Sequence, residues 1–452
     1  MQRQLALTFA RHCARAAAVM LAGFIFCKAQ PAAASQILLS DAAVHTVSGE
    51  LLSPGFVLIE GSVIKGVAAK PADLKPDRNA QKISLKGLHL YPGLIGLNTA
   101  LGLVEISAVR ATRDVNEVGE FTPDVQSWIA VNPDSELIPV ARANGLAYFQ
   151  PAPQGGMVAG QSGLVATDGW TSEQMAVVKP VALHIYWPSM ALNTTPKEEF
   201  KDKSKWKSLE DQAKERQEKI RELSEFFDDA RAYAKAREAA AKTGAEFAAN
   251  PPWEAMLPWL RGELPLMIHA DDVRQIKSAV NWAETNFLKM VLAGGRDAWQ
   301  VAGWLAEKKV PVLYEHVFTQ PARATDPYDI HFKAPELLRK AGVHFAIGMG
   351  ATTFDAGLMK NLPYSAAQAV AFGLPKTEAI KSVTLYPAQL IGVADRFGSI
   401  EPSKQASLFA ADGDILDIRA NVQRLWIEGK EVPIDTRHTR LYEKYKNRPR
   451  PQ

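Results

Sequence analysis

The fold is decided by the stretch Tyr91–Gly102, which reads YPGLIGLNTALG. It stands at a change of pattern along the chain. Before it, from residue 36 to about residue 90, short apolar runs are separated by glycines, a pattern typical of antiparallel strands joined by turns. After it, strand-like and helix-like segments alternate as far as Phe397. The stretch therefore predicts the beginning of a second structural unit.

Short apolar runs recur through this second unit, and helical patterning separates each from the next. The runs are Leu146–Phe149, Pro265–His269, Leu288–Leu292, Val310–Tyr314 and Val343–Ile347. Such an alternation indicates an α/β protein with a parallel sheet that is buried on both faces. A (β/α)₈ TIM barrel is the economical solution at this length, and a doubly wound open sheet is the alternative. In a barrel, the residues that follow each strand form the mouth of the active site.

Strand patterns return near the end of the chain, at Ser407–Ala410 and Val422–Lys430. We therefore expect both ends to pair into one small β-sandwich, a composite domain over residues 35–90 and 397–435. The barrel would then occupy residues 91–396. A chain of 452 residues with 47% hydrophobic composition is long enough to bury two such cores.

A charged insertion over residues 195–250 interrupts the barrel pattern. Apolar residues recur in it at three- and four-residue spacing, which predicts a long amphipathic helix. These residues are Ile220, Leu223, Phe227, Ala230 and Ala234. The helix is expected to decorate the barrel as a lid, as a dimer arm, or as a solvated helix lying on the surface.

The first 34 residues have the three parts of a secretory signal peptide: basic residues, an apolar run over residues 16–27, and small residues at 32–34. They contain both cysteines and four basic residues, so removing them changes the formal charge from +3 to −1. We expect an exported, periplasmic protein without disulfides and without stable membrane insertion. This charge does not favour nucleic acid as a partner. A small-molecule substrate or ligand is expected, and a homo-oligomer is a further option.

Four motifs together resemble the amidohydrolase superfamily, especially its imidazolonepropionase-like branch and an exported subgroup. Ser53–Gly61 is similar to the family's early sheet strands, and Tyr91–Ile95 is similar to its first barrel strand. Thr384–Gly392 and Gly398–Lys404 are similar to the last helix and the return to the sheet domain. The resemblance covers nearly the whole chain after the leader and implies a metal-dependent hydrolase.

The resemblance implies metal ligands that this chain largely lacks. Members carry His-x-His on strand one, Lys or Glu on strand four, histidines on strands five and six, and Asp on strand eight. Here Asn98 and Ala100 occupy the strand-one positions, and His269 matches the strand-five ligand. One remaining histidine is too few for zinc, which takes three or four ligands. The metal site is therefore expected to be degenerate, with zinc doubtful.

The other ligand strands have the same gaps. Strand six, residues 291–295, has no histidine, and Gly350 stands where the strand-eight aspartate belongs. Lys179 is a candidate for strand four. His184 and His316 follow apolar runs, so they either join His269 or are ordinary histidines near strand ends.

The segment after strand one is dense with charge and is expected at the mouth. It supplies the catalytic candidates that accompany His269, which are Glu105, Arg110, Arg113, Asp114 and Glu117. Such groups bind a carboxylate-bearing substrate or act as acid and base, and the alternative is a salt-bridged loop. Glycine-rich Gln154–Gly163 is expected to form tight turns.

Two functions follow from these observations. One is a hydrolase acting on carbon–nitrogen bonds other than peptide bonds, such as those of cyclic amides, with a reduced or absent metal site. The alternative is a non-catalytic pseudo-hydrolase that serves as a periplasmic binding or interaction module.

Overall fold

The computed structural model describes residues 36–449. The predicted signal peptide and both cysteines lie outside this range. Within it, no helix combines the length and the apolar character that crossing a bilayer requires.

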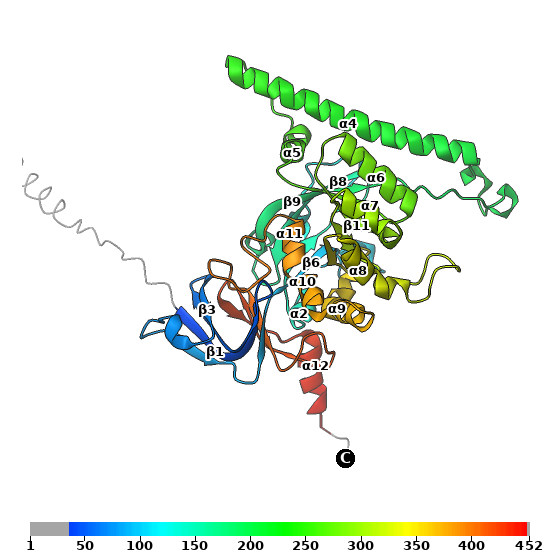
Figure 1. Cartoon of the computed structure of the whole chain (residues 1–452). Coiled ribbons are helices and arrows are strands. Elements are labelled where there is room, and N and C mark those ends of the chain that lie inside the picture. The colour runs from blue at the N-terminus through cyan, green and yellow to red at the C-terminus, as the bar shows by residue number, and fades with distance from the viewer. Residues whose placement is uncertain (1–35, 450–452) are drawn as a thin grey trace, which may run out of the picture.

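The central unit is a mixed α/β barrel-like sheet of eight strands (Figure 1). Its strands pair in chain order, so each lies beside its predecessor. They are β6 (Leu94–Thr99), β7 (Leu146–Pro151), β8 (Val158–Ala166), β9 (Ala176–Tyr186), β10 (Leu266–Ala270), β11 (Met290–Gly294), β12 (Val312–Tyr314) and β13 (Phe345–Ile347). The five apolar runs predicted as strands overlap five of these strands.

One strand departs from the predicted all-parallel arrangement. β8 pairs antiparallel with both β7 and β9. The physical reason lies in the connections, because residues 152–157 and 167–175 alone separate β8 from its neighbours, whereas a parallel crossover needs a dozen or more residues. The glycine-rich segment predicted as turns therefore forms a turn at its beginning and then the first half of β8.

The two edge strands of this sheet, β6 and β13, do not pair with each other. A short connecting segment forms hydrogen bonds with both of them. The Ile347 amide donates to Ser382 O at 2.9 Å, and the Ile95 amide donates to Val383 O at 2.9 Å. Residues 382–383, which follow helix α10 (Lys376–Lys381), thus lie between β13 and β6. We refer to this pair of hydrogen bonds as the seam.

Helices cover the outside of the barrel-like sheet, as Figure 1 shows. They include α2 (Leu137–Arg142), α3 (Ser172–Met175), α5 (Pro251–Leu260), α6 (Val273–Thr285), α7 (Ala302–Glu307), α8 (Ile330–Ala341), α9 (Leu362–Ala371) and α11 (Leu385–Leu390). α6 illustrates how the sequence fixes a helix start: the Asp272 carboxylate accepts hydrogen bonds from the amides of Arg274 and Gln275.

A second sheet joins both ends of the described chain. Its order is β16-β15-β14-β5-β1-β2-β3, with β4 paired to β1. The bounds are β1 (Gln36–His45), β2 (Leu51–Glu60), β3 (Val63–Ala68), β4 (Gln81–Ser84), β5 (His89–Pro92), β14 (Leu408–Ala411), β15 (Val422–Ile427) and β16 (Lys430–Val432). Its apolar core includes fully buried Leu90, Leu408 and Trp426. A last helix, α12 (Arg437–Lys446), follows it.

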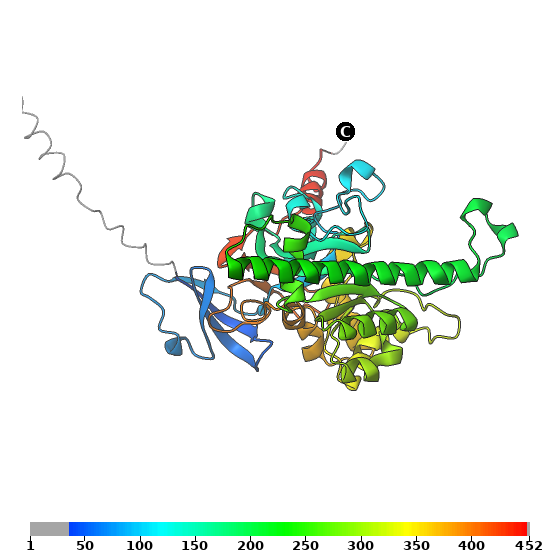
Figure 2. The same ribbon diagram turned by 90° about the horizontal axis from the view of Figure 1, so that it is seen from above.

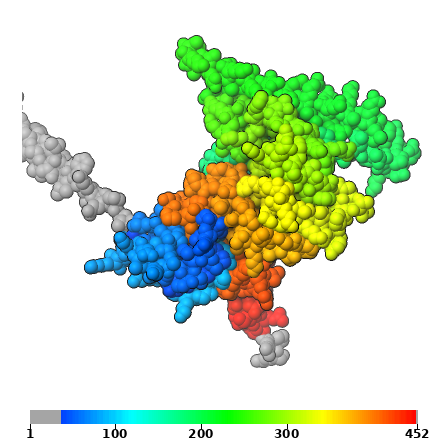
Figure 3. Space-filling model, viewed as in Figure 1, coloured from blue at the N-terminus to red at the C-terminus, as the bar shows by residue number. Residues whose placement is uncertain are grey.

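The charged insertion contains one helix of 35 residues, α4 (Leu209–Thr243). It begins at the Ser208 cap and ends at Gly244, which has a left-handed φ of 69°. Leu223, Phe227 and Ala230 are buried, as their spacing predicted. Figure 2 shows α4 running across one side of the molecule, and in Figure 3 its ends extend past the helices beneath it.

Candidate active site

A cavity of about 520 Å³ lies at the carboxyl ends of the barrel strands. Residues that end β6, β9, β10 and β11 line it, together with residues that follow β12 and β13. The polar lining includes Asn98, Tyr186, His269, Asp271, Glu315, His316 and Asp355. We refer to it as the mouth cavity. This is the end of a barrel at which active sites form.

Asn98 is a buried residue of the mouth cavity that contacts one of its carboxyl groups. It is the penultimate residue of β6 and has a left-handed φ of 50°, a conformation that costs energy for a residue other than glycine. Its side chain is buried, and Nδ2 donates to Glu315 Oε1 at 2.7 Å. Asn98 Oδ1 has no hydrogen-bond partner among the described residues. The amide of Asn98 thus positions the carboxyl group of Glu315.

Asp271 and His316 form a second pair. His316 Nε2 donates to Asp271 Oδ1 at 2.8 Å, and the amide of Arg296 donates to the same oxygen at 3.2 Å. None of these hydrogen bonds uses Asp271 Oδ2. The side chain of Asp271 remains 43% exposed, so this carboxylate can meet a molecule in the mouth cavity.

Three glycines, at the end of β11 and after the end of β13, leave room for the carboxyl groups. A Cβ atom on Gly294 would lie 2.7 Å from Asp271 Oδ1, and one on Gly350 would lie 3.0 Å from Asp355 Oδ2. A Cβ atom on Gly348 would lie 3.1 Å from Glu315 Cγ. The carboxyl groups of Asp271, Asp355 and Glu315 therefore occupy space that side chains at these three glycines would otherwise fill.

His269 ends a chain of buried polar groups that runs into the barrel. Its Nε2 lies 3.1 Å from His184 Nδ1, and His184 Nε2 lies 2.8 Å from Ser162 Oγ. Tyr186 stacks on the His269 ring at a centroid distance of 4.0 Å. These contacts fix the imidazole of His269 with one ring nitrogen already used.

The ionisable groups of the mouth cavity differ in their affinity for protons. Burial raises the pKa of Glu315 well above its usual value, the Asn98 hydrogen bond opposes this, and the charges of Asp271 and Asp355 add to it. Burial also acts to raise the pKa of Asp271, but the hydrogen bond and charge of His316 outweigh it and the pKa is lowered. Burial lowers the pKa of His269 to about 4. The cavity thus combines a proton-bearing carboxyl group with a charged carboxylate.

The mouth cavity does not fit the metal set that the resemblance implies. Ala100 offers no donor, Asn98 Nδ2 and His269 Nε2 have protein partners, and carboxylates crowd Gly294 and Gly350. Over residues 36–449, no three His, Cys, Asp or Glu side chains gather in an arrangement that could hold a metal ion. No step of the reaction is therefore assigned to a metal here.

The predicted residues are divided between the mouth cavity and its surroundings. His269 and His316 line the cavity, and His184 lies buried beneath His269. Lys179 is exposed in the first half of β9, away from the carboxyl end of that strand.

The charged segment after β6 lies outside the mouth cavity. Asp114 and Glu117 line a separate cavity of about 590 Å³ with Asn116 and Val118. Arg110 and Arg113 are exposed, and Glu105 is half-buried. None of these five charged residues lines the mouth cavity, and the ion pairs of the described residues include none of them. Their part in catalysis stays a prediction.

Sequence reasoning missed the three carboxyl groups of Asp271, Glu315 and Asp355. Asp271 and Glu315 follow strands β10 and β12, so the rule that strand ends form the mouth could have found them. Asp355 follows β13 by eight residues and comes back to Gly350 through a turn. No spacing of residues in the sequence indicates that Asp355 approaches Gly350.

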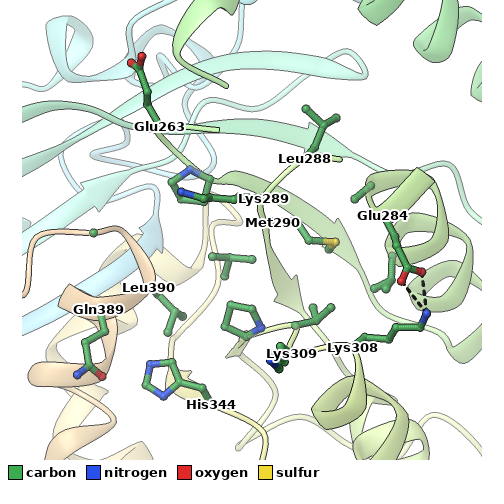
Figure 4. A pocket seen from close by; sticks show the side chains of 17 residues that line it. Glu263, Glu284, Leu288, Lys289, Met290, Lys308, Lys309, His344, Gln389 and Leu390 are labelled. Carbon is green, nitrogen blue, oxygen red and sulfur yellow. Dashed lines mark hydrogen bonds and ion pairs between the residues drawn. The ribbon is translucent and has the colours of Figure 1, made fainter. Parts of the chain in front are cut away.

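A further cavity of about 570 Å³ lies at the opposite end of the barrel, where β10, β11 and β12 begin (Figure 4). Apolar residues such as Leu288 and Met290 line much of it, and Glu284 pairs with Lys308 at 2.7 Å. In barrels, this end contributes to stability and not to catalysis. The mouth cavity is therefore the candidate site.

Comparison with known proteins gives the chain a consistent set of relatives. The sequence model of the Amidohydrolase family matches residues 330–432. Amidohydrolase tasK of Hapsidospora irregularis is 24% identical over 191 residues, which are 39% of this chain and 18% of that protein. N-acetylgalactosamine-6-phosphate deacetylase of Escherichia coli O157:H7 is 38% identical over 58 residues, which are 13% of this chain and 14% of that protein. The chain thus spans less than a fifth of the length of these two relatives.

Solved structures match over most of the chain. An amidohydrolase from Thermotoga maritima MSB8 has a TM-score of 0.75 and 26% identity, and the match covers 88% of this chain and 99% of that one. A prolidase complexed with N-methylphosphonate-L-proline has a TM-score of 0.52 and 16% identity, with the same coverage. The second likeness concerns the fold alone.

Proposed function

Since this chain belongs to the amidohydrolase superfamily, we propose that it hydrolyses carbon–nitrogen bonds of small molecules. The favoured substrates are amides other than peptides, such as cyclic amides. The mouth cavity is the site, and its own acid and base replace the chemistry that a bound metal supplies elsewhere in the family.

One observation carries this proposal: the carboxyl groups of Glu315 and Asp271 line the same cavity in different surroundings, Glu315 beside the Asn98 amide and Asp271 beside His316. Glu315 has a raised pKa and Asp271 a lowered one. When the surroundings raise the pKa of one carboxyl group and lower the pKa of another, the first group suits the role of the acid and the second that of the base in hydrolysis.

The reaction balances with these two groups and water. Asp271 Oδ2 accepts a proton from a water molecule as the water oxygen bonds to the substrate carbonyl carbon. The Glu315 carboxyl group gives its proton to the amide nitrogen, and the carbon–nitrogen bond breaks. Proton transfer from Asp271 to Glu315 then restores both groups. His316, through its 2.8 Å hydrogen bond, positions Asp271.

A non-catalytic binding module is the second candidate. The poor fit between the mouth cavity and a metal ion favours it, because the family's hydrolytic chemistry depends on metal-bound water. In this case the cavity would bind a small molecule without cleaving it.

The test is an assay of the purified protein against cyclic amides, imidazolones and dipeptides, with and without chelator. We expect cleavage of the cyclic amides, unaffected by chelator and reduced at least about a hundredfold in Glu315→Gln, as for loss of a general acid. Glu284→Gln, at the opposite end of the barrel, is the matched control and should retain activity.

The outcomes separate the candidates. Absence of turnover across the panel, in protein that still binds a panel compound, would establish the binding module. Activity that Glu315→Gln leaves intact would reject the assigned acid. Cleavage of dipeptides in preference to cyclic amides would correct the substrate class.

We also propose that the protein acts in the periplasm, on the basis of the leader pattern in residues 1–34. Fractionation of cells that express the full chain tests this, and recovery from the cytoplasm would contradict it.

A further inference from the structure

The mouth cavity is lined by three acidic side chains and two histidines, His269 and His316. The acidic side chains are Asp271, Glu315 and Asp355, and none of the lysines or arginines within residues 36–449 lines the cavity. The arginines expected there from the sequence, Arg110 and Arg113, lie outside it. A ligand that enters this cavity therefore meets hydrogen-bond acceptors and negative charge.

A second observation points to the same kind of ligand. Asn98 is 1% exposed and lines the mouth cavity, and its Oδ1 has no partner among the described residues. With Nδ2 donating to Glu315 Oε1, the oxygen is the atom of this amide that has no partner in the described part of the chain. A buried acceptor without a partner costs about 1–3 kcal/mol. An N–H group of a ligand would satisfy it.

Asp355 offers a further acceptor in the lining of the same cavity. Its Oδ2 accepts from the amide of Thr352 at 3.0 Å and also from the hydroxyl of that residue. None of these hydrogen bonds uses Asp355 Oδ1. The carboxylate is thus held in place by one oxygen while the other remains available.

The lining also contains Trp187, whose Nε1 donor has no partner within residues 36–449. A carbonyl oxygen is the complement of an indole N–H group. A ligand that carries both a charged N–H group and an amide carbonyl would satisfy both kinds of unpaired atom.

We infer that the substrate is a small amide that carries a positively charged amino or guanidino group, held by Asp355 and Asn98 Oδ1. The inference rests on the proposed function for the amide, whereas the recognition of the cation stands on the cavity itself. It reverses the expectation of a carboxylate-bearing substrate.

Three compounds of nearly equal shape test the inference by calorimetric titration of the purified protein. N-(4-aminobutyl)acetamide carries a cation, N-pentylacetamide is neutral, and 5-acetamidopentanoate carries an anion. We expect the cation to bind at least about tenfold more tightly than the neutral compound, and the anion to bind most weakly. Equal affinities, or preference for the anion, would overturn the inference.

Variants assign the preference to the named atoms. Asp355→Asn should reduce the tenfold preference to about twofold or less, and Asn98→Leu should weaken binding of the cation even if Asp355→Asn does not fold. Asp134→Asn removes an equal charge from an exposed position outside the cavity and should change nothing. A preference that survives both cavity variants would also overturn the inference.

Failure of this inference is distinguishable from failure of the proposed function. Selective binding of the cation without cleavage supports the inference and rejects the hydrolase. Cleavage of neutral amides without any preference for the cation does the reverse.

Discussion

Asp271 Oδ1 lies 2.7 Å from the point at which a side chain on Gly294 would begin. The absence of a side chain at the end of β11 therefore makes room for the carboxylate of the residue that follows β10. Any residue larger than glycine at this position must displace Asp271 from His316.

Gly294→Ala is expected to disable the site. The new methyl group would move Asp271, and the φ of 86° adds about 1–2 kcal/mol of backbone strain. We expect a large loss of turnover, together with a lower midpoint of thermal unfolding. Gly303→Ala is the control, since a Cβ atom there meets nothing within 4 Å and alanine favours the helix.

The stability of the protein should depend on pH through Glu315. Its folded-state pKa is raised above 4.5, so the folded form binds more protons than the unfolded chain over that interval. The contribution is present below pH 4.5 and is lost as the pH rises through the folded-state pKa. The free energy of unfolding of Glu315→Gln, measured with denaturant at several pH values, should not show this decrease. A pH profile identical to that of the unsubstituted protein would contradict the assignment.

His269 should make the stability of the protein depend on pH in the opposite direction. Its pKa falls from 6.5 to about 4 because the imidazole is buried. The unfolded chain therefore binds the proton more readily, and stability is lost as the pH falls from 6.5 towards 4. We expect His269→Gln to be less sensitive to acid over this range, as measured by the free energy of unfolding. A steeper acid loss in the variant would refute this.

Metal analysis gives an independent check on the poor fit of the site. We expect purified protein to contain zinc well below one ion per chain, and chelator to leave the unfolding midpoint unchanged. One or two tightly held ions per chain, removable only with loss of stability, would contradict the description of the mouth cavity.

Docking of α4 should depend on Phe227. Its ring is fully buried and contacts Trp282 at a centroid distance of 5.0 Å. Phe227→Ala should cost the docked helix about 3–5 kcal/mol and expose it to limited proteolysis. Leu209→Ala, which truncates a side chain that is 49% exposed, should leave the digestion pattern unchanged.

Much of the fold could be predicted because buried strands and amphipathic helices have periodic patterns. The run Val310–Tyr314 contains β12, and the buried stripe of α4 includes Leu223, Phe227 and Ala230. The antiparallel direction of β8 could not be predicted from its own residues, since apolar content does not specify strand direction. The short connections around it decide that direction.

The candidate site was predictable only in part. His269 was proposed from the resemblance to a strand-five ligand, and His316 was an open candidate because it follows an apolar run. Both line the mouth cavity. Asp355 could not be identified, because its approach to Gly350 depends on a turn after β13 and on the absence of a side chain at that glycine. Contacts of this kind arise from the three-dimensional path of the chain and leave no periodic pattern.

Because of the seam through residues 382–383, the number of hydrogen bonds between neighbouring segments differs around the barrel. Around most of it, adjacent strands share a ladder of hydrogen bonds, but the amides of Ile95 and Ile347 depend on single bonds to a short connector. Asn98 and the segment that leads to Asp355 extend from the two strands on either side of this join. Few hydrogen bonds hold the ring at this join, so we expect it to open here more readily than between paired strands, which would separate the two groups proposed to hold a cation. Amide hydrogen exchange should be faster at Ile95 and Ile347 than at Leu292, and a bound cation should slow it by tying the two sides of the join together.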